Sequence, residues 1–435
     1  MADSFESLVK SLKKDMLPKK KPELICPAGT WASLNEVLPF ADAVYFGATD
    51  SLNMRTRANN FEYSEIQKVV EKCKEKNVRT YFTLNTIIYD DELVELHQAI
   101  ELVKEYGVDA VICHDQASIQ ICRHLDMPFH VSTQANITNK LSAKFYEALG
   151  AKMIILSREL SIGQVSEITK SLETAKAEVF VHGAMCAMFS GRCFFSAEEM
   201  GFKREFAANK GACVQPCRRM FWILDEEGNK IETDGNMFFN SKDLCMIDHM
   251  DLLVASGIGG LKIEGRIRDP TYCGVVSRVY REAIDSVFES DYTDQKILEW
   301  KRQLDQIFNR GFHTGFYFDT PTLNEQNRRI RGNVSDKHRQ LLGYVENYYP
   351  KVKAAVIKAV SGALKIDDEV LIEGPEKSEG ATYFTQIVKS IQIDGENINE
   401  TPYASSENHV HLGILMEKPV KRNDKVFIFI RNSEQ

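Results

Sequence analysis

Four cysteines in one glycine-punctuated stretch are the side chains of this sequence best suited to chemistry. Cys186 and Cys193 lie in HGAMCAMFSGRCFF, and Cys213 and Cys217 lie in GACVQPCRRM, so the spacings are C-x6-C and C-x3-C with nineteen residues between the pairs. Four soft thiolates can bind zinc or an iron–sulfur cluster. A zinc ribbon would show two C-x2-C pairs, and the three-cysteine pattern of radical-SAM enzymes is missing. The irregular spacing favours a [4Fe–4S] cluster, with zinc and unliganded thiols as the alternatives.

The composition predicts a compartment in which these thiols stay reduced. The first 22 residues form a charged amphipathic extension with no apolar signal core. No apolar run reaches the roughly 18 residues that a membrane helix needs. We therefore expect a cytoplasmic protein without a membrane segment, whose ten cysteines form no disulfides.

The net charge of −8 excludes a broadly basic coat for nucleic acid. Positive charge is concentrated locally, and NRRIRGNVSDKHR (327–339) is either a basic patch or a solvated linker. The cations that could meet an RNA backbone are the N-terminal lysines, Arg218, Arg219, Arg328, Arg329 and Arg331.

Eight short apolar runs alternate with helical patterns and predict a parallel sheet that positions the cysteine stretch. Near-continuous apolar runs are typical of strands buried on both faces. The runs cover residues 23–29, 43–48, 79–85, 110–115, 129–133, 152–160, 178–186 and 260–266. Eight strands close a (β/α)8 TIM-like barrel. An open doubly wound sheet is the alternative, but G-x-G-x-x-G is absent after the first run.

The pattern divides the chain into an N-terminal extension (1–22), the α/β barrel (23–330) and a C-terminal domain (340–435). Some seventy residues separate the seventh and eighth runs, and this insertion carries the four cysteines. A helical stretch (271–309) and an irregular connection follow the eighth run. From about residue 340, period-two segments with glycine and asparagine turns predict a small all-β barrel.

Polar side chains follow the predicted strands where a barrel of this kind has its active site, at the carboxyl ends. Such groups cost free energy at buried strand ends unless a ligand or another polar group pairs with them. They are therefore either a functional site or a satisfied polar layer under the loops. The residues are Tyr45, Arg55, Arg57, Asn85, His114, Asp115, Ser132, Gln134, Arg158, Glu159, His182, Lys262, Glu264 and Arg266.

The stretch EVFVHGAMCAMFSGRCFFS (178–196) closely resembles the signature of the collagenase-like peptidases of unknown catalytic type, peptidase family U32. Phe195 stands where the signature has an aliphatic residue. The blocks ELICPAG, AVYFGA, CVQPCR, FNSKDLC and LKIEGRIR also look like recurring parts of the family, so the resemblance covers about residues 23 to 330. The β-rich tail is similar to the C-terminal domain of longer members. Signature positions in register are Glu178, Phe180, Gly183, Cys186, Gly191, Cys193 and Ser196.

The resemblance implies a reaction that differs from the family's peptidase label. Several members are oxygen-independent hydroxylation proteins with a four-cysteine [4Fe–4S] cluster, acting on ubiquinone precursors, a ribosomal RNA cytidine or the wobble uridine of tRNA. The RNA enzymes are linked to prephenate. A chain of this length with this tail looks most like the members that make 5-hydroxyuridine in tRNA. The resemblance thus implies tRNA as partner, prephenate as co-substrate and a cluster on Cys186, Cys193, Cys213 and Cys217, with Cys245 as the reserve ligand.

Roles for the strand-end residues follow from that chemistry. A dicarboxylate needs paired cationic donors, and a pyrimidine edge needs amide or hydroxyl partners. The expected substrate-binding residues are Arg158, Lys262, Arg266, Ser132, Gln134 and Arg55. The expected catalytic residues are Glu264, His182, Asn85 and His114, of which Glu264 or His182 would move protons.

Two alternatives remain at this point. One is a collagenase-like peptidase, with Cys186 and either His182 or His114 as a dyad, although neither G-x-S-x-G nor H-E-x-x-H is present. The other is a hydroxylase of a different substrate, either the ribosomal RNA cytidine or a quinone precursor.

Overall fold

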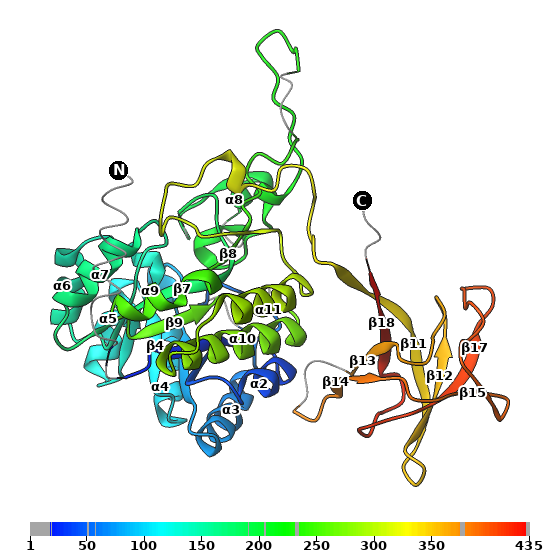
Figure 1. Ribbon diagram of the computed structural model, residues 1–435. Helices are drawn as coiled ribbons and strands as arrows, with labels where there is room; N and C mark the ends of the chain where they lie inside the picture. The colour runs from blue at the N-terminus through cyan, green and yellow to red at the C-terminus, as the bar shows by residue number, and fades with distance from the viewer. Residues whose placement is uncertain are drawn as a thin grey trace. The chain divides into compact units, whose positions relative to one another are not determined.

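The computed structural model describes residues 18, 20–49, 52–56, 58–189, 191–203, 206–230, 235–374 and 379–431. Most of the expected N-terminal extension, with its lysines up to Lys19, lies outside these residues, as does Arg57. The chain divides into two compact units: the first ends at Val334, and the second begins at Ser335 and also includes the short segment Thr30–Ala32 (Figure 1).

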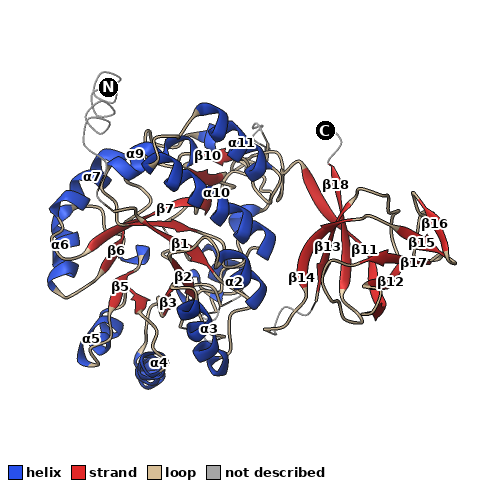
Figure 2. Ribbon diagram, turned by 60° about the horizontal axis from the view of Figure 1, so that its bottom comes forward, coloured by secondary structure: helices blue, strands red, loops and turns tan. Residues whose placement is uncertain are grey.

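The first unit is a closed ring of parallel strands, which confirms the predicted TIM-like barrel (Figure 2). Gly260 lies opposite Glu23 on one neighbouring strand and opposite Glu178 on the other, so the last strand joins the first and the seventh and closes the ring. The alternative of an open sheet is therefore wrong. In order around the ring the strands are β1 (Glu23–Pro27), β2 (Ala43–Phe46), β3 (Arg79–Thr83), β4 (Ala110–Cys113), β5 (Phe129–Val131), β6 (Met153–Ile155), β7 (Lys176–Ala184) and β9 (Gly260–Ile263).

Helices surround the ring, as Figure 2 shows. Polar residues cap several of them: Asp115, Ser161 and Asp269 each accept a hydrogen bond from a backbone N–H of the first turn, which satisfies a donor that the helix leaves unpaired. None of the helices within the described residues is long and apolar enough to cross a membrane. The helices are α2 (Trp31–Val37), α3 (Tyr63–Glu75), α4 (Leu93–Glu105), α5 (Gln116–His124), α6 (Lys140–Ala148), α7 (Ile162–Ser171), α9 (Met250–Ala255), α10 (Pro270–Phe288) and α11 (Asp294–Asp305).

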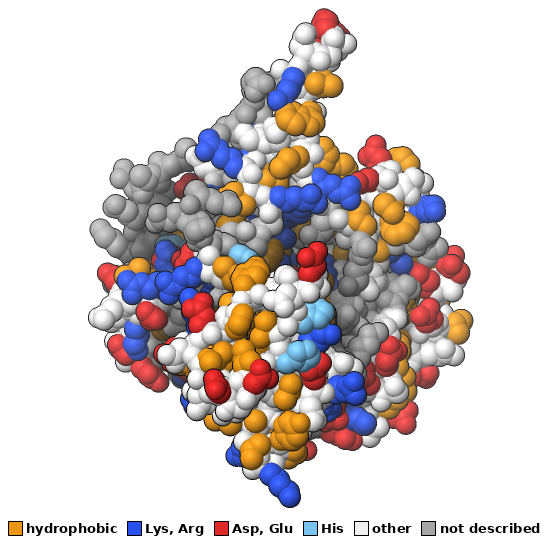
Figure 3. Space-filling model, turned by 90° about the vertical axis from the view of Figure 1, so that its right-hand side faces the viewer, with side chains coloured by type: hydrophobic (Ala, Val, Ile, Leu, Met, Phe, Trp, Pro, Cys, Tyr) orange, Lys and Arg blue, Asp and Glu red, His pale blue; other side chains and the backbone are white. Residues whose placement is uncertain are grey.

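The cysteine-bearing insertion follows β7, as the sequence predicts, but it also extends the sheet. Its strand β8 (Asp243–Cys245) pairs antiparallel with the end of β7, and β10 (Phe312–His313) pairs with β8. The rest is a short helix α8 (Phe195–Glu199) and irregular chain. An arm (residues 219–230) projects from the insertion, and Figure 3 shows hydrophobic and basic side chains along it with acidic ones at its tip.

The second unit is an antiparallel all-β domain, as the period-two pattern predicts. The sheet order is β14-β13-β18-β11-β12-β17-β15-β16, and its strands pack around one apolar core that includes Leu342, Ile357 and Ile372. The bounds are β11 (Lys337–Tyr349), β12 (Ala354–Ala359), β13 (Glu369–Glu373), β14 (Tyr383–Ile387), β15 (Ile391–Ile393), β16 (Glu396–Ile398), β17 (Val410–Leu415) and β18 (Lys425–Arg431).

A glycine in β7 allows the close packing of β7 against the end of β9. Gly183 has a φ of +108°, and a Cβ there would lie 2.4 Å from the carbonyl oxygen of Glu264. Gly150 has a φ of +98°, and a Cβ there would meet nothing within 4 Å. We predict that Gly183→Ala lowers the free energy of unfolding by about 1–3 kcal/mol more than Gly150→Ala, because only Gly183→Ala adds a backbone clash to the strain of a positive φ.

Urea unfolding followed by tryptophan fluorescence measures this difference. Of the three tryptophans of the chain, Trp222 and Trp300 belong to the first unit, so their signal follows the barrel, whereas Trp31 groups with the second unit. Equal losses for the two variants would contradict the close approach of β7 to Glu264.

Candidate functional site

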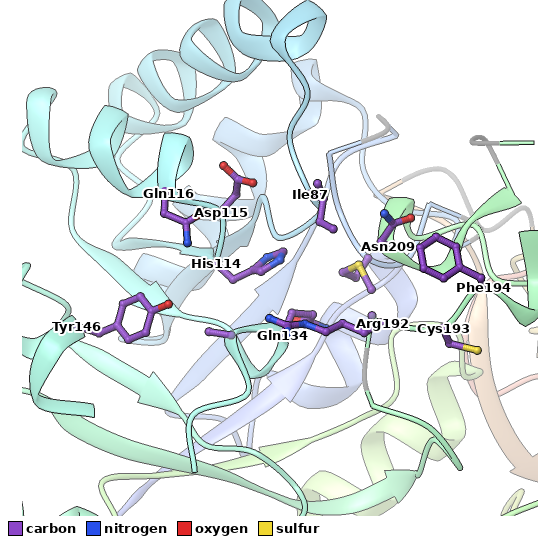
Figure 4. Close-up of a pocket in the computed structure, with 13 residues that line it drawn as sticks. Ile87, His114, Asp115, Gln116, Gln134, Tyr146, Arg192, Cys193, Phe194 and Asn209 are labelled. Atoms are coloured by element: carbon purple, nitrogen blue, oxygen red, sulfur yellow. The ribbon is translucent and has the colours of Figure 1, made fainter. Parts of the chain in front are cut away.

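The carboxyl ends of the barrel strands enclose two adjoining cavities. The inner cavity has a volume of about 50 Å³, and the outer one, between the β4–α5 connection and the cysteine insertion, has a volume of about 440 Å³ (Figure 4). Met54, Gln134 and Gly191 line both cavities and separate them. The expected site residues on the inner cavity are Arg55, Asn85, Ser132, Gln134, Arg158, Cys186, Lys262, Glu264 and Arg266.

Glu264 is the central acid of the inner cavity. Its Oε1 lies 3.1 Å from Nη2 of Arg55, and its Oε2 lies 3.9 Å from Nη2 of Arg158. Burial alone would raise the pKa of Glu264, but the charges of Arg55, Arg158 and Arg266 outweigh burial, and the pKa is lowered. Glu264 is therefore an ionised carboxylate held by arginines.

Two of these arginines are fixed by contacts of their own. Arg158 donates to the carbonyl oxygen of Ala184 at 2.7 Å, and its guanidinium lies 3.8 Å from the centre of the Phe180 ring. Its buried Nε has no hydrogen-bond partner. Arg266 donates to Thr83 Oγ1 at 2.7 Å and to Asn53 Oδ1 at 2.9 Å. Both cations are thus held in place before any ligand arrives.

A second ion pair lies at the base of the inner cavity. Nζ of Lys262 is 2.7 Å from Oε1 of Glu178, and the two side chains are 5% and 0% exposed. Lys262 also lies 4.3 Å from the centre of the Tyr45 ring. Four cations, Lys262 and the three arginines, therefore face two carboxylates, which leaves two formal positive charges.

Three expected substrate-binding or catalytic residues form a polar wall. Asn85 Nδ2 lies 3.2 Å from Ser132 Oγ and 3.3 Å from Gln134 Oε1, and Ser132 donates to Gln134 as well. Asn85 Oδ1 accepts the backbone N–H of Met54 at 3.0 Å. The three side chains thus pair with one another, and a substrate that used them would have to exchange these bonds.

The four cysteines of the insertion are electrostatic neighbours. Burial raises the pKa of Cys217, and interactions with Cys186, Cys213 and Cys193 raise it further. Burial also raises the pKa of Cys213, again with contributions from Cys186 and Cys193. All four are at least partly exposed. The sequence prediction that these thiols gather in one place agrees with this mutual interaction.

Their arrangement differs from that of a single-ion site. Within the described ranges, no group of three or more His, Cys, Asp or Glu side chains is arranged to hold one metal ion. A zinc ion needs its sulfurs at about 2.3 Å from a common centre. The thiolates of a [4Fe–4S] cluster each bind a different iron, so their sulfurs stay farther apart than those around one ion. Four thiols that are at least partly exposed are a donor set that an iron–sulfur cluster or zinc could use.

Arg55 connects the cysteines to the acid of the inner cavity. The charge of Glu264 raises the pKa of Arg55, and Cys186 raises it as well. Arg55 in turn lowers the pKa of Cys213 against the effect of burial. One cation is therefore shared between the carboxylate and the thiols.

The two expected catalytic histidines lie in different places. His182 does not reach either cavity, because the β7–β9 register is irregular between Phe180 and His182, and its ring packs between Tyr280, Tyr272 and Phe312. Burial lowers its pKa to about 4. The assignment of His182 as a proton carrier at the site is therefore corrected. His114 lines the outer cavity.

Other sequence candidates have structural partners. Cys245, the reserve ligand, is buried against the Tyr280 hydroxyl at 3.8 Å. Arg218 donates to backbone carbonyls of Met185 and Ser241, and Arg219 pairs with Glu199. The guanidinium of Arg328 lies 5.1 Å from the Phe238 ring. Arg329 and Arg331 are at the surface.

Sequence reasoning missed several residues of the two cavities. Asn53 and Thr83 accept hydrogen bonds from Arg266. Asn53 lies in a loop and Thr83 at the end of β3, and neither is a charged residue that would stand out in the sequence. The outer cavity adds Tyr146, Arg192 and Asn209. Of these three residues, only Arg192 lies in the signature stretch. Its positive charge next to Cys193 is a sequence signal that could have indicated it as a site residue.

Known proteins similar to this chain are named either as proteases or as tRNA hydroxylation proteins. A model of peptidase family U32 matches residues 29–327. A Methanocaldococcus jannaschii protein described as an uncharacterized protease is 35% identical, over 93% of this chain and 98% of that protein. A collagenase of Porphyromonas gingivalis is 31% identical, over 95% and 99%. The tRNA hydroxylation protein P1 of Bacillus subtilis is 30% identical, over 87% and 88%.

Glu264 and Glu178 should respond to pH in opposite directions. The pKa of Glu264 is lowered, so its ionised form adds stability that is present above the ordinary value of 4.5 and is lost as the pH falls through the lowered pKa. Burial raises the pKa of Glu178 more than Lys262 lowers it, so its stability contribution falls as the pH rises through that raised pKa.

We therefore expect Glu264→Gln to cost on the order of 3 kcal/mol at pH 7, and less below pH 4.5. The deficit of Glu178→Gln should instead shrink as the pH rises above the ordinary carboxyl value of 4.5. Urea unfolding of both variants and the wild type across this range measures the two deficits. Deficits that change with pH in the same direction would contradict the opposite shifts.

Proposed function

The chain belongs to peptidase family U32, and we propose that it hydroxylates the wobble uridine of tRNA at C5 to give 5-hydroxyuridine, without oxygen. The reaction would use a [4Fe–4S] cluster and prephenate as co-substrate. Relatives named tRNA hydroxylation protein support tRNA hydroxylation as the reaction class. The observation that carries the finer proposal is the surplus of fixed cations in the barrel mouth beside four cysteines.

The charge of the inner cavity fits a dicarboxylate. Lys262 and three arginines leave two formal positive charges uncompensated by Glu178 and Glu264. Uncompensated buried charge is costly, so a ligand with two carboxylates would be stabilised there. Arg158, with its unpartnered Nε, can contribute a second donor to a bidentate contact. The cavity of about 50 Å³ has room for a carboxylate group, so the rest of the co-substrate would extend toward the outer cavity.

The cysteines are the groups that would hold the cluster. Cys186 lines the inner cavity and Cys193 the outer one, so two of the four thiols border the cavities. A bound [4Fe–4S] cluster would supply electron-transfer chemistry next to the substrate. Arg55, which interacts with both Glu264 and Cys186, would offset the negative charge of the thiolates.

The residues of the inner cavity can also handle a proton. Glu264 stays ionised, so it can accept a proton from a substrate group that displaces Arg55. His182 cannot do so because its ring is buried against Tyr280, beyond the break in the β7–β9 register. Glu264 is thus the general base that the geometry supports best.

A collagenase-like peptidase is the second candidate, because relatives named collagenase cover nearly the whole chain. A cysteine peptidase needs a thiolate paired with a histidine. Nδ1 of His182 faces Tyr280, and buried Nδ1 of His114 has no hydrogen-bond partner. The geometry therefore favours hydroxylation.

The relatives also bear on the choice among hydroxylase substrates. Proteins of Bacillus subtilis and Escherichia coli that match most of this chain are both named for tRNA hydroxylation. These names support tRNA over a ribosomal RNA cytidine or a quinone precursor as the substrate of this chain.

Removal of a cluster ligand should abolish the cluster. After anaerobic purification, the wild type should be brown with an absorbance near roughly 400 nm, and Cys193→Ala and Cys217→Ala should lose it. Cys245→Ala is the matched control, because its buried thiol contacts Tyr280 instead of the other cysteines, and it should keep the colour. Stoichiometric zinc without iron in the wild type would show that the cluster proposal is wrong.

The reaction itself can be tested by nucleoside mass spectrometry of tRNA. In a strain without this protein and without any other route to the same nucleoside, 5-hydroxyuridine and its derivatives should disappear, and the wild-type gene should restore them. Arg158→Gln should fail to restore them because it removes a fixed cation of the inner cavity. Arg302→Gln, on the exposed face of α11, should restore them fully.

Two results would overturn this assignment. Unchanged 5-hydroxyuridine in the deletion strain would rule out the reaction. Cleavage of denatured collagen by the purified protein would make the peptidase the better assignment.

A further inference from the structure

The two cavities of the barrel mouth differ in size in a way that separates their ligands. The inner cavity, about 50 Å³, has the volume of about two water molecules. A pyrimidine base does not fit there. The outer cavity, about 440 Å³, falls within the roughly 300–1,000 Å³ of ordinary ligand pockets.

The lining of the outer cavity has the chemistry of a base pocket. Figure 4 shows the His114 ring near its centre, with Tyr146 on one side and Asn209 and Phe194 on the other. Bases that leave a single-stranded loop are bound by stacking on aromatic or arginine planes and by hydrogen bonds to their edges. Tyr146, Phe194 and Arg192 provide such planes, and Asn209 provides an amide for an edge.

Two side chains of this cavity have a buried polar atom that lacks a hydrogen-bond partner: His114 at Nδ1 and Asn209 at Oδ1. Burial lowers the pKa of His114 to about 4, with Arg192 acting in the same direction, so the ring is neutral at pH 7. A neutral imidazole offers one donor and one acceptor, and a buried polar atom without a partner costs free energy until a ligand pairs with it. His114 lies near the centre of the cavity, so it is the better placed of the two to meet a ligand there (Figure 4).

We propose that the outer cavity holds the target pyrimidine and that Nδ1 of His114 hydrogen-bonds the base edge. This inference rests on the proposed function and names the place of the nucleotide within it. The base then lies beside the co-substrate, whose carboxylate lies on the arginines of the inner cavity and whose remainder extends toward the outer cavity.

The partition between the cavities is thin enough for the two ligands to meet. Gly191 has a φ of +77°, and a Cβ there would lie 2.9 Å from Cγ of Gln134 and 3.1 Å from Cε of Met54. Only a residue without a side chain allows this approach. The reactive edge of the base would therefore face Gln134, Met54 and Gly191, with Cys193 on the same cavity wall.

The test measures binding of a synthetic anticodon stem–loop RNA to the anaerobically purified full-length protein by fluorescence anisotropy. One RNA carries uridine at the wobble position, and a second carries an abasic residue there. For the wild type, loss of the base should weaken binding by about tenfold, as expected when a buried hydrogen bond and base stacking are lost. His114→Phe should weaken binding of the uridine RNA by about tenfold and should bind the abasic RNA no more weakly than the wild type does.

Two further variants separate recognition from misfolding. His114→Asn keeps a polar atom near the position of Nδ1 and should recover part of the affinity for the uridine RNA. His124→Phe, on the exposed last turn of α5, should bind both RNAs as the wild type does. The proposal would be overturned if loss of the base weakened RNA binding by His114→Phe as much as it weakens RNA binding by the wild type. It would also be overturned if His114→Phe bound the uridine RNA with wild-type affinity.

The outcome is distinguishable from failure of the proposed function. If 5-hydroxyuridine disappears in the deletion strain while the base and His114 act additively, the reaction stands and the base lies elsewhere. If 5-hydroxyuridine persists in that strain, the reaction fails whatever the binding data give. Failure of the wild type to bind the stem–loop at all overturns this inference.

Discussion

The two carboxylates beside the inner cavity, Glu178 and Glu264, must be neutralised by cations, and the rest of the site depends on this constraint. An isolated buried charge is far more costly than a paired one. Glu178 meets Lys262, and Glu264 meets Arg55 and Arg158. Lys262, Glu264 and Arg266 alternate along LKIEGR, so one strand and its end deliver an acid between two cations to the same cavity. Because the cations around this cavity outnumber its two acids, a ligand that supplies negative charge would be stabilised there.

Arg55 links the charges of the barrel to those of the insertion. It lies 3.1 Å from Glu264, and its pKa is raised by that carboxylate and also by Cys186. Thiolates on the insertion and the carboxylate of Glu264 therefore compete for one cation. Ligation that makes the thiols anionic would draw Arg55 toward them and weaken its hold on Glu264, which would make that carboxylate more basic. In the proposed function, this arginine would link occupancy of the cysteines to proton transfer at the inner cavity.

The barrel was predictable from the sequence because strands buried on both faces leave continuous apolar runs, and the carboxyl-end rule then located the arginines, Lys262 and Glu264. The same rule failed for His182. Strand β7 continues to Ala184 and pairs with β8, and its register against β9 breaks between Phe180 and His182. Regular alternation would have turned His182 inward with Phe180. The pairing with β8 depends on a short segment about sixty residues further along the chain, so no local pattern could indicate it. The outer cavity was invisible for a similar reason: Tyr146, Arg192 and Asn209 come from segments that meet only in the fold.

The cysteines show how one environment can oppose one chemistry and suit another. Burial raises the pKa of Cys213 and Cys217, and each of the other thiols adds to the cost of a first thiolate. A nucleophilic cysteine needs the opposite, namely a cation or histidine that favours the thiolate without a metal. Cluster ligation removes the penalty, because iron replaces the proton on each sulfur and cancels the repulsion among them. Mutual repulsion of this kind suits thiols that act only as ligands. Assembly of the proposed cluster would release protons and would become more favourable as the pH rises.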